Sequence, residues 1–277
     1  MTKIHTKKRT DFIFLSLVIG LLFLRFPFAI LLSYHKIPIS GNVGSKILFD
    51  GTYLITAILI IIKSENLSNY NIDFLSLVLF VSAPVAGILA KYLSIKAAIT
   101  GTVPVDKFKI AVSVLFLFSL IVLQPSLRKE SNKKSLIWFL ISVIVGVFVG
   151  IVMGVVSDFQ DEFKNPNHPS ILYFFSSIII QLNNAAITTE PLFRGFLWGI
   201  LKNRQWKDHW IWLFQAILFT FAHIYYLGKY NYSFFIIVPI SSLILGLLVW
   251  RSRSIGVSMI THSLINSIGD TIAHFTW

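Results

Sequence analysis

The sequence contains no cysteine, so disulfide bonds, thiolate catalysis and cysteine metal ligands are excluded. Charge is also scarce: Asp, Glu, Lys and Arg make up 13% of the chain, whereas hydrophobic residues make up 55%. Soluble domains carry about 25% charged residues. The chain therefore has too little polar surface for an ordinary water-soluble fold.

Long apolar runs take the place of polar surface. Runs of about 17 to 25 mostly apolar residues recur, and each is long enough to cross the hydrocarbon core of a bilayer as a helix. We therefore expect an all-α fold, a polytopic transmembrane helical bundle of eight or nine spans in the cell membrane. The expected spans are Phe12–Tyr34, Ile47–Ile62, Phe74–Leu93, Phe108–Leu123, Ser135–Val156, Ile171–Leu201, Trp210–Leu227, Phe234–Trp250 and Ile255–Phe275.

The basic residues predict an orientation for this bundle. The net charge is +12, but the surplus lies in short loops between apolar runs, so it does not indicate nucleic-acid binding. Lysine and arginine favour cytoplasmic loops. Most of them fall on the side of the basic N-terminus, which we expect to be cytoplasmic, although the four lysines in Lys91–Lys109 run against this orientation.

Ionisable residues divide the chain into two parts of a single membrane domain. Residues 1–170 contain only Arg25 and Asp50 as ionisable groups away from the span ends, and we interpret them as an N-terminal membrane-spanning scaffold. Residues 171–277 carry several such groups. Ionisable side chains at membrane depth are costly and usually mark a function, so this part is the expected functional core.

The stretch TTEPLFRGFL, Thr188–Leu197, places an acid and a base inside an apolar run. Glu190 and Arg194 are four residues apart, so on a helix they share a face and can pair. A purely structural ion pair is the alternative interpretation. Pro191 lacks a backbone N–H and is expected to kink the helix and to free a backbone acceptor.

Two further motifs follow on later spans. In FTFAHIYY, His223 lies one turn after Phe219, and a structural histidine bonded to a neighbouring carbonyl remains an alternative. In the last span, His262, Asn266, Asp270 and His274 are spaced four apart. Each step of four drifts by about 40°. We therefore expect His262 and Asn266 to act together and the later two to rotate away, with an interhelical hydrogen-bond ladder as the structural alternative.

Together these side chains suit hydrolysis inside a membrane. A carboxylate with an imidazole can deprotonate water, and a second imidazole with a carboxamide can stabilise an oxyanion. Alternatively, Glu190, His223 and His262 could hold zinc or another divalent metal, which would lower the pKa of a bound water. No HExxH pair supports the metal interpretation, and the sequence leaves the choice open.

The three motifs in this order resemble the CAAX-processing and bacteriocin-processing (Abi) family of intramembrane proteases. Its pattern is Glu-Glu-x-x-x-Arg, then Phe-x-x-x-His, then His-x-x-x-Asn or Asp, and this chain shows TEPLFR, FTFAH and HSLIN. The resemblance covers roughly Ile171 to Trp277. It implies that Glu190, His223, His262 and Asn266 are catalytic, with Arg194, Pro191 and Phe219 in support.

One position departs from the family pattern. The family's first glutamate, five residues before the arginine, is Thr189 here, and Glu190 matches the second. In the family the first glutamate is thought to activate the attacking water together with the second-motif histidine. A threonine hydroxyl can position water but cannot serve as a base near neutrality, so either Glu190 or His223 takes that role or the chain is an inactive relative.

Three functions follow from these residues. The leading hypothesis is an intramembrane endopeptidase acting on a peptide or a membrane-anchored protein, with His223 and Glu190 handling water and His262 with Asn266 forming the oxyanion site. The second is a catalytically impaired relative that serves bacteriocin self-immunity or an accessory role. The third is a transporter or channel, whose pathway Glu190, Arg194 and Asp270 would line.

Overall fold

The computed structural model describes residues 2–28, 41–92, 114–118, 120–122, 132–159, 171–228 and 230–272. Regular structure in these ranges is entirely helical, without a strand, which confirms the all-α expectation. The longer helices are α1 (Thr2–Phe23), α3 (Gly41–Ile62), α4 (Phe74–Tyr92), α6 (Asn132–Phe159), α7 (Ile171–Gln181), α10 (Asp208–Phe221), α11 (Val238–Ser252) and α12 (Ile255–Ile272). Short 3₁₀ or π-helical segments lie at Leu24–Phe28, Ser64–Tyr70, Leu182–Ala186, Pro191–Leu197, Ile224–Tyr226 and Ser233–Ile237.

Two segments are long and apolar enough to cross a membrane in the part of the chain that the structure describes, Lys133–Val156 and Ser233–Ser252. Asp50–Ile62 and Phe74–Ala83 are apolar but shorter. The count of eight or nine spans therefore stays a prediction. Most of the expected span Phe108–Leu123 lies outside the described residues, as does most of the stretch Lys91–Lys109. The orientation therefore stays a prediction too.

The outer face of α6 is apolar and open. Ile144 and Phe148, one turn apart, are 66% and 68% exposed. Contiguous apolar surface of this kind is rare on soluble proteins and marks contact with a partner or a membrane. Together with the apolar length of α6, it fits a helix that faces lipid.

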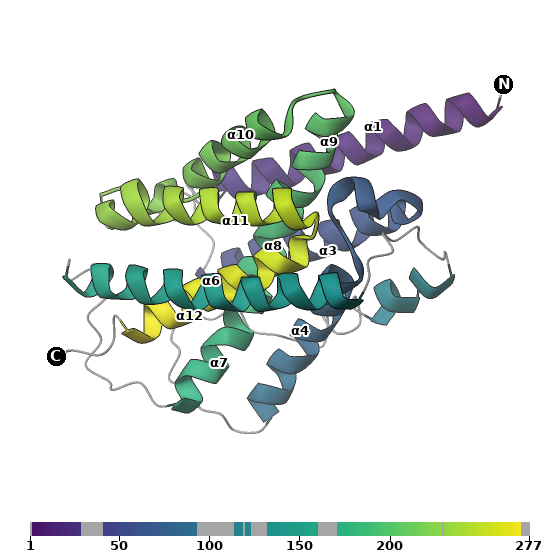
Figure 1. The fold of residues 1–277 in the computed structure, drawn as a ribbon. Helices are drawn as coiled ribbons and strands as arrows, with labels where there is room; N and C mark the ends of the chain where they lie inside the picture. The colour runs from purple at the N-terminus through teal and green to yellow at the C-terminus, as the bar shows by residue number, and fades with distance from the viewer. Residues whose placement is uncertain are drawn as a thin grey trace.

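Helix α12 is the centre of the arrangement. It contacts α4, α6, α7, α8 (Ile187–Glu190) and α11. Figure 1 shows α6 running across α12, with α10 and α11 on one side and α7 and α4 on the other. The side chains of α12 from Ile255 to Ile265 are almost all buried, so residues on its several faces meet different helices.

Close approach of α6 and α12 depends on glycine. Three glycines one turn apart on α6 face α12: Gly146, Gly150 and Gly154. A Cβ atom added at any of them would lie 2.7 or 2.8 Å from a Cβ atom of α12. Such a spacing is closer than real Cβ atoms approach one another, so only glycine permits this contact between the two helices.

Asn71 joins the loop before α4 to the C-terminal part through two hydrogen bonds. Asn71 adopts a left-handed conformation (φ 56°), which asparagine tolerates better than most residues. Its side-chain Nδ2 donates to the carbonyl oxygen of Arg194 at 3.0 Å. Its own carbonyl oxygen accepts from the backbone N–H of Ile255, at the start of α12, at 2.8 Å.

Charged side chains join the loop before α10 to the loop between α11 and α12. Asp208, at the start of α10, accepts from Lys202 at 2.9 Å and from Arg253 at 2.8 Å. Burial raises the pKa of Asp208, but the hydrogen bonds and charges of Arg253 and Lys202 outweigh it, and the net pKa is lowered. Asp208 therefore ties the loop before α10 to the loop before α12.

We predict that Gly150→Ala destabilises the protein by about 1 to 3 kcal/mol, because the added methyl group overpacks the contact with α12. The matched control is Gly51→Ala on α3, where a Cβ meets nothing within 4 Å. There alanine should stabilise the helix slightly. The measurement is the thermal unfolding midpoint of purified protein in detergent; equal midpoints for both variants would contradict the close contact.

We predict that Asp208→Asn lowers stability at pH 7 by at most about 1 kcal/mol, the usual range for partly exposed ion pairs. Because the folded pKa lies below its unfolded value, the stabilisation is present above the unfolded pKa and is lost as pH falls through the folded pKa. Thermal midpoints of wild type and variant should therefore converge in acid. A difference that grows as pH falls would overturn this account.

Candidate active site

The site begins on a continuous helical run from Ile171 to Asn203 that contains two π-helical turns. The expected kink at Pro191 takes a milder form: its backbone stays helical (φ −58°, ψ −39°), and a π-helical segment follows from Pro191 to Leu197. Proline crowds the carbonyl four residues before it, and a wider turn accommodates the ring. Single π-helical turns are frequent at functional sites.

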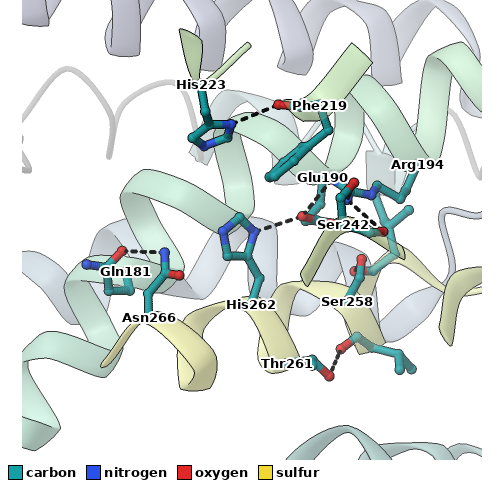
Figure 2. Close-up of polar contacts among 12 residues, drawn as sticks. Gln181, Glu190, Arg194, Phe219, His223, Ser242, Ser258, Thr261, His262 and Asn266 are labelled. Atoms are coloured by element: carbon teal, nitrogen blue, oxygen red, sulfur yellow. Dashed lines mark hydrogen bonds and ion pairs between the residues drawn. The ribbon is translucent and has the colours of Figure 1, made fainter. Parts of the chain in front are cut away.

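Glu190 is the centre of the polar cluster. Its side chain is fully buried, and its Oε1 atom accepts from Arg194 at 3.3 Å and from His262 Nδ1 at 2.8 Å. The expected pairing of Glu190 with Arg194 is therefore present. The contact with His262 joins residues that are 72 positions apart, and it brings the first motif directly onto the third (Figure 2).

Arg194 is held by more than its acid partner. Its guanidinium donates to the side-chain oxygen of Ser242 on α11 at 2.8 Å and to the Ser242 carbonyl at 3.3 Å. It also lies over the ring of Phe219, 4.1 Å from the centroid. A buried cation is stable only with such compensation, so Phe219 and Ser242 are part of the support for Glu190.

His223 takes the place that the second motif predicts, next to Phe219. Its Nδ1 lies 2.8 Å from the Phe219 carbonyl oxygen, and the two rings are 4.6 Å apart. The Phe219 ring also contacts His262, with centroids 5.8 Å apart. His223 and His262 therefore share the Phe219 ring as a neighbour, while His262 is the one that bonds to Glu190.

The hydrogen bonds of the two histidines fix their tautomers. A carbonyl oxygen and an ionised carboxylate only accept, so each histidine donates from Nδ1. In the neutral ring, Nε2 is then an acceptor with a free lone pair. Both His223 and His262 thus present Nε2 as a hydrogen-bond acceptor on the side away from the Nδ1 anchor.

Asn266 and Asp270 meet on one partner that the sequence had not suggested. Asn266 Nδ2 donates to Gln181 Oε1 at 3.1 Å, and Gln181 Nε2 donates to Asp270 Oδ2 at 3.1 Å. The long Gln181 side chain therefore links Asn266 to Asp270. The expectation that Asp270 rotates off toward the membrane face stays a prediction. His274 lies outside the described residues.

Thr189 is buried, with 1% of its surface exposed, on the same short segment as Glu190. Its position agrees with the departure seen in the sequence: a neutral side chain precedes the acid that binds His262. The carboxylate of the site is therefore Glu190, and it is already engaged by two donors.

The possible metal ligands do not assemble as a set. In the ranges that the structure describes, no three side chains of His, Asp or Glu come close enough together to hold a metal ion. Glu190 and His262 touch, whereas His223 contacts Phe219 and its carbonyl instead. The residues Glu190, His223 and His262 therefore do not fit a three-ligand zinc site in this arrangement.

Three contributors to the site escaped the sequence interpretation: Gln181, Ser242 and Asn71. Gln181 stands in the polar run QLNN inside an apolar span, and Ser242 in the pair SS of α11. Polar residues at such positions were the available signal. Asn71 gave no comparable signal, since it lies in a loop that looks ordinary in sequence.

A comparison with known protein families matches the part of the chain that holds the site. Residues 169–268 match the family described as type II CAAX prenyl endopeptidase Rce1-like. The matched segment holds all three motifs, so this part of the chain is similar to the CAAX-processing membrane endopeptidases. No curated protein and no solved structure matches the chain.

We predict that Glu190→Gln destabilises the fold by about 3 to 5 kcal/mol, because it leaves the fully buried Arg194 without its counter-charge. The double variant Glu190→Gln/Arg194→Met removes both charges and should recover much of that loss. Thermal midpoints in detergent measure both. A double variant less stable than the single one would show that the pair is not the main partner of Arg194.

Proposed function

We propose that this chain is an intramembrane endopeptidase that hydrolyses a peptide bond at or near the membrane. Its substrate is a peptide or a membrane-anchored protein, and it lies in the cell membrane as a multi-pass protein with a cytoplasmic N-terminus. The observation that carries this proposal is the contact of Glu190 with His262, inside the segment that matches a family of endopeptidases.

The geometry supports a carboxylate and imidazole pair as the base. Glu190 accepts from His262 Nδ1, which orients the ring and stabilises the imidazolium that forms when Nε2 takes a proton. Water gives this proton to Nε2, and the resulting hydroxide attacks the carbonyl carbon. The imidazolium then returns the proton to the leaving amine as the C–N bond breaks.

This assignment shifts roles relative to the expectation from sequence. There, His223 and Glu190 handle water and His262 stands at the oxyanion. In the structure Glu190 is fully buried against Arg194 and His262, so it supports His262, whereas His223 is anchored on the Phe219 carbonyl. His223 keeps a proposed catalytic role through its Nε2 acceptor, which can bind a water or the leaving amine.

Thr189 supports one alternative, a catalytically impaired relative in bacteriocin self-immunity or an accessory role. With threonine in the place of the family's first acid, the site has one carboxylate fewer. If His262 cannot replace that acid as the base, the helices would serve only to bind a peptide. This alternative and the protease make opposite predictions for the wild-type protein.

We predict that wild-type protein in liposomes cleaves an internally quenched peptide with an S-prenylated CAAX end. His262→Ala and His262→Gln should each lower kcat/KM by about 100-fold or more, because neither side chain accepts a proton. Glutamine still offers an N–H donor. Activity retained in His262→Gln would assign His262 to the oxyanion and contradict its role as base.

The matched control is His209→Ala, an exposed histidine outside the site, which should leave cleavage unchanged. Thr189→Glu tests the alternative: activity gained from a silent wild type would establish the impaired relative, and an active wild type would exclude it. Each assay is repeated with a chelator and then with added zinc. Loss and zinc-dependent recovery would show that a metal takes part and would overturn the base assigned here.

A further inference from the structure

Asp270, Gln181 and Asn266 form a chain of hydrogen bonds beside His262. Gln181 ends α7, whereas Asn266 and Asp270 are one turn apart on α12. Asn266 itself follows His262 by one turn and is half-buried, so part of it stays accessible. These hydrogen bonds therefore link the site to Asp270, a residue that the proposed reaction does not use.

The hydrogen bonds run in one donor-to-acceptor order, from Asn266 to Gln181 to Asp270, and the carboxylate of Asp270 sets this order. An ionised carboxylate only accepts, so Gln181 must turn its nitrogen toward Asp270 and its oxygen toward Asn266. Asn266 must then turn its nitrogen toward that oxygen. Both amide orientations therefore follow from the donors and acceptors of the hydrogen-bond network.

One consequence concerns the free end of Asn266. With its nitrogen bound to Gln181, the oxygen of the carboxamide points the other way. Figure 2 shows this oxygen on the side of Asn266 that faces His262. The group that Asn266 offers beside Nε2 of His262 is therefore an acceptor.

We propose that Asp270 and Gln181 are positioning residues that hold the Asn266 oxygen toward the attacking water. This inference rests on the proposed function and gives Asn266 a different role from the oxyanion donor expected from sequence. The water donates one hydrogen to His262 Nε2 and the other to Asn266 Oδ1. His262 takes its proton, and the bond to Asn266 aims the oxygen lone pair at the carbonyl carbon.

Exchanging the carboxamide of Asn266 and the carboxylate of Asp270 reverses the order of the hydrogen bonds and tests the proposal. Asn266→Asp puts a second acceptor against Gln181 while Asp270 still demands its nitrogen, and Asp270→Asn removes the group that sets the direction. Each single variant should lower kcat by about 10-fold, the value of one hydrogen bond between neutral groups, with little change in KM. In Asn266→Asp/Asp270→Asn, Gln181 turns round: its nitrogen donates to the new carboxylate at position 266, and its oxygen accepts from the new carboxamide at position 270.

The double variant should therefore recover to within about threefold of wild-type kcat, because Gln181 again holds the side chain at position 266 with one oxygen toward the water. An Asn266 that donates to the oxyanion predicts the opposite, since aspartate has no N–H; a double variant as slow as Asn266→Asp would overturn the proposal. Ser267→Ala, which removes a hydrogen bond to the Ser263 carbonyl on the same helix, is the matched control and should keep wild-type kcat.

Thermal midpoints separate this inference from the proposed function. The hydrogen-bond chain predicts lower midpoints in both single variants and recovery in the double variant, whether or not the protein cleaves anything. Recovery of stability in a protein without activity would contradict the proposed protease function and support the hydrogen-bond network of Asp270, Gln181 and Asn266. If wild type cleaves and both single variants are as stable and as fast as wild type, the role of the hydrogen-bond network is contradicted and the protease function is supported.

Discussion

The buried carboxylate of Glu190 is the interaction on which the site depends. A charge taken fully out of water is tolerated only when donors replace the lost solvation. Arg194 and His262 supply them, and Arg194 in turn needs Ser242 and the Phe219 ring. Compensation of one charge thus brings side chains of α10, α11 and α12 to one segment, and orients one imidazole as a by-product.

Local spacing made part of this arrangement predictable. Glu190 and Arg194 pair because four residues make about one helical turn, and the order of three motifs pointed to the family before any contact was known. Helical content also followed from the apolar runs. Each of these features depends on residues close together in the chain, or on a pattern of residue types.

Contacts between distant segments were not predictable in the same way. The spacing of Asn266 and Asp270 concerns α12 alone, and it could not predict that Gln181 of α7 bridges the two side chains. A kink at Pro191 is expected from the effect of proline on one turn, whereas the packing around it decides on a π-helical segment. Neither feature follows from one helix considered without its neighbours.

The two hydrogen bonds of Asn71 show that the segment matching the family depends on residues before it in the sequence. The family match begins at residue 169, yet the carbonyl of Arg194 and the first N–H of α12 both find their partner in the loop before α4. A fragment cut at the match would leave these peptide groups unpaired at the point where the helices of the candidate site meet. The recognisable segment is therefore not a portable module, and any chimera that transplants it must carry its own substitute for Asn71.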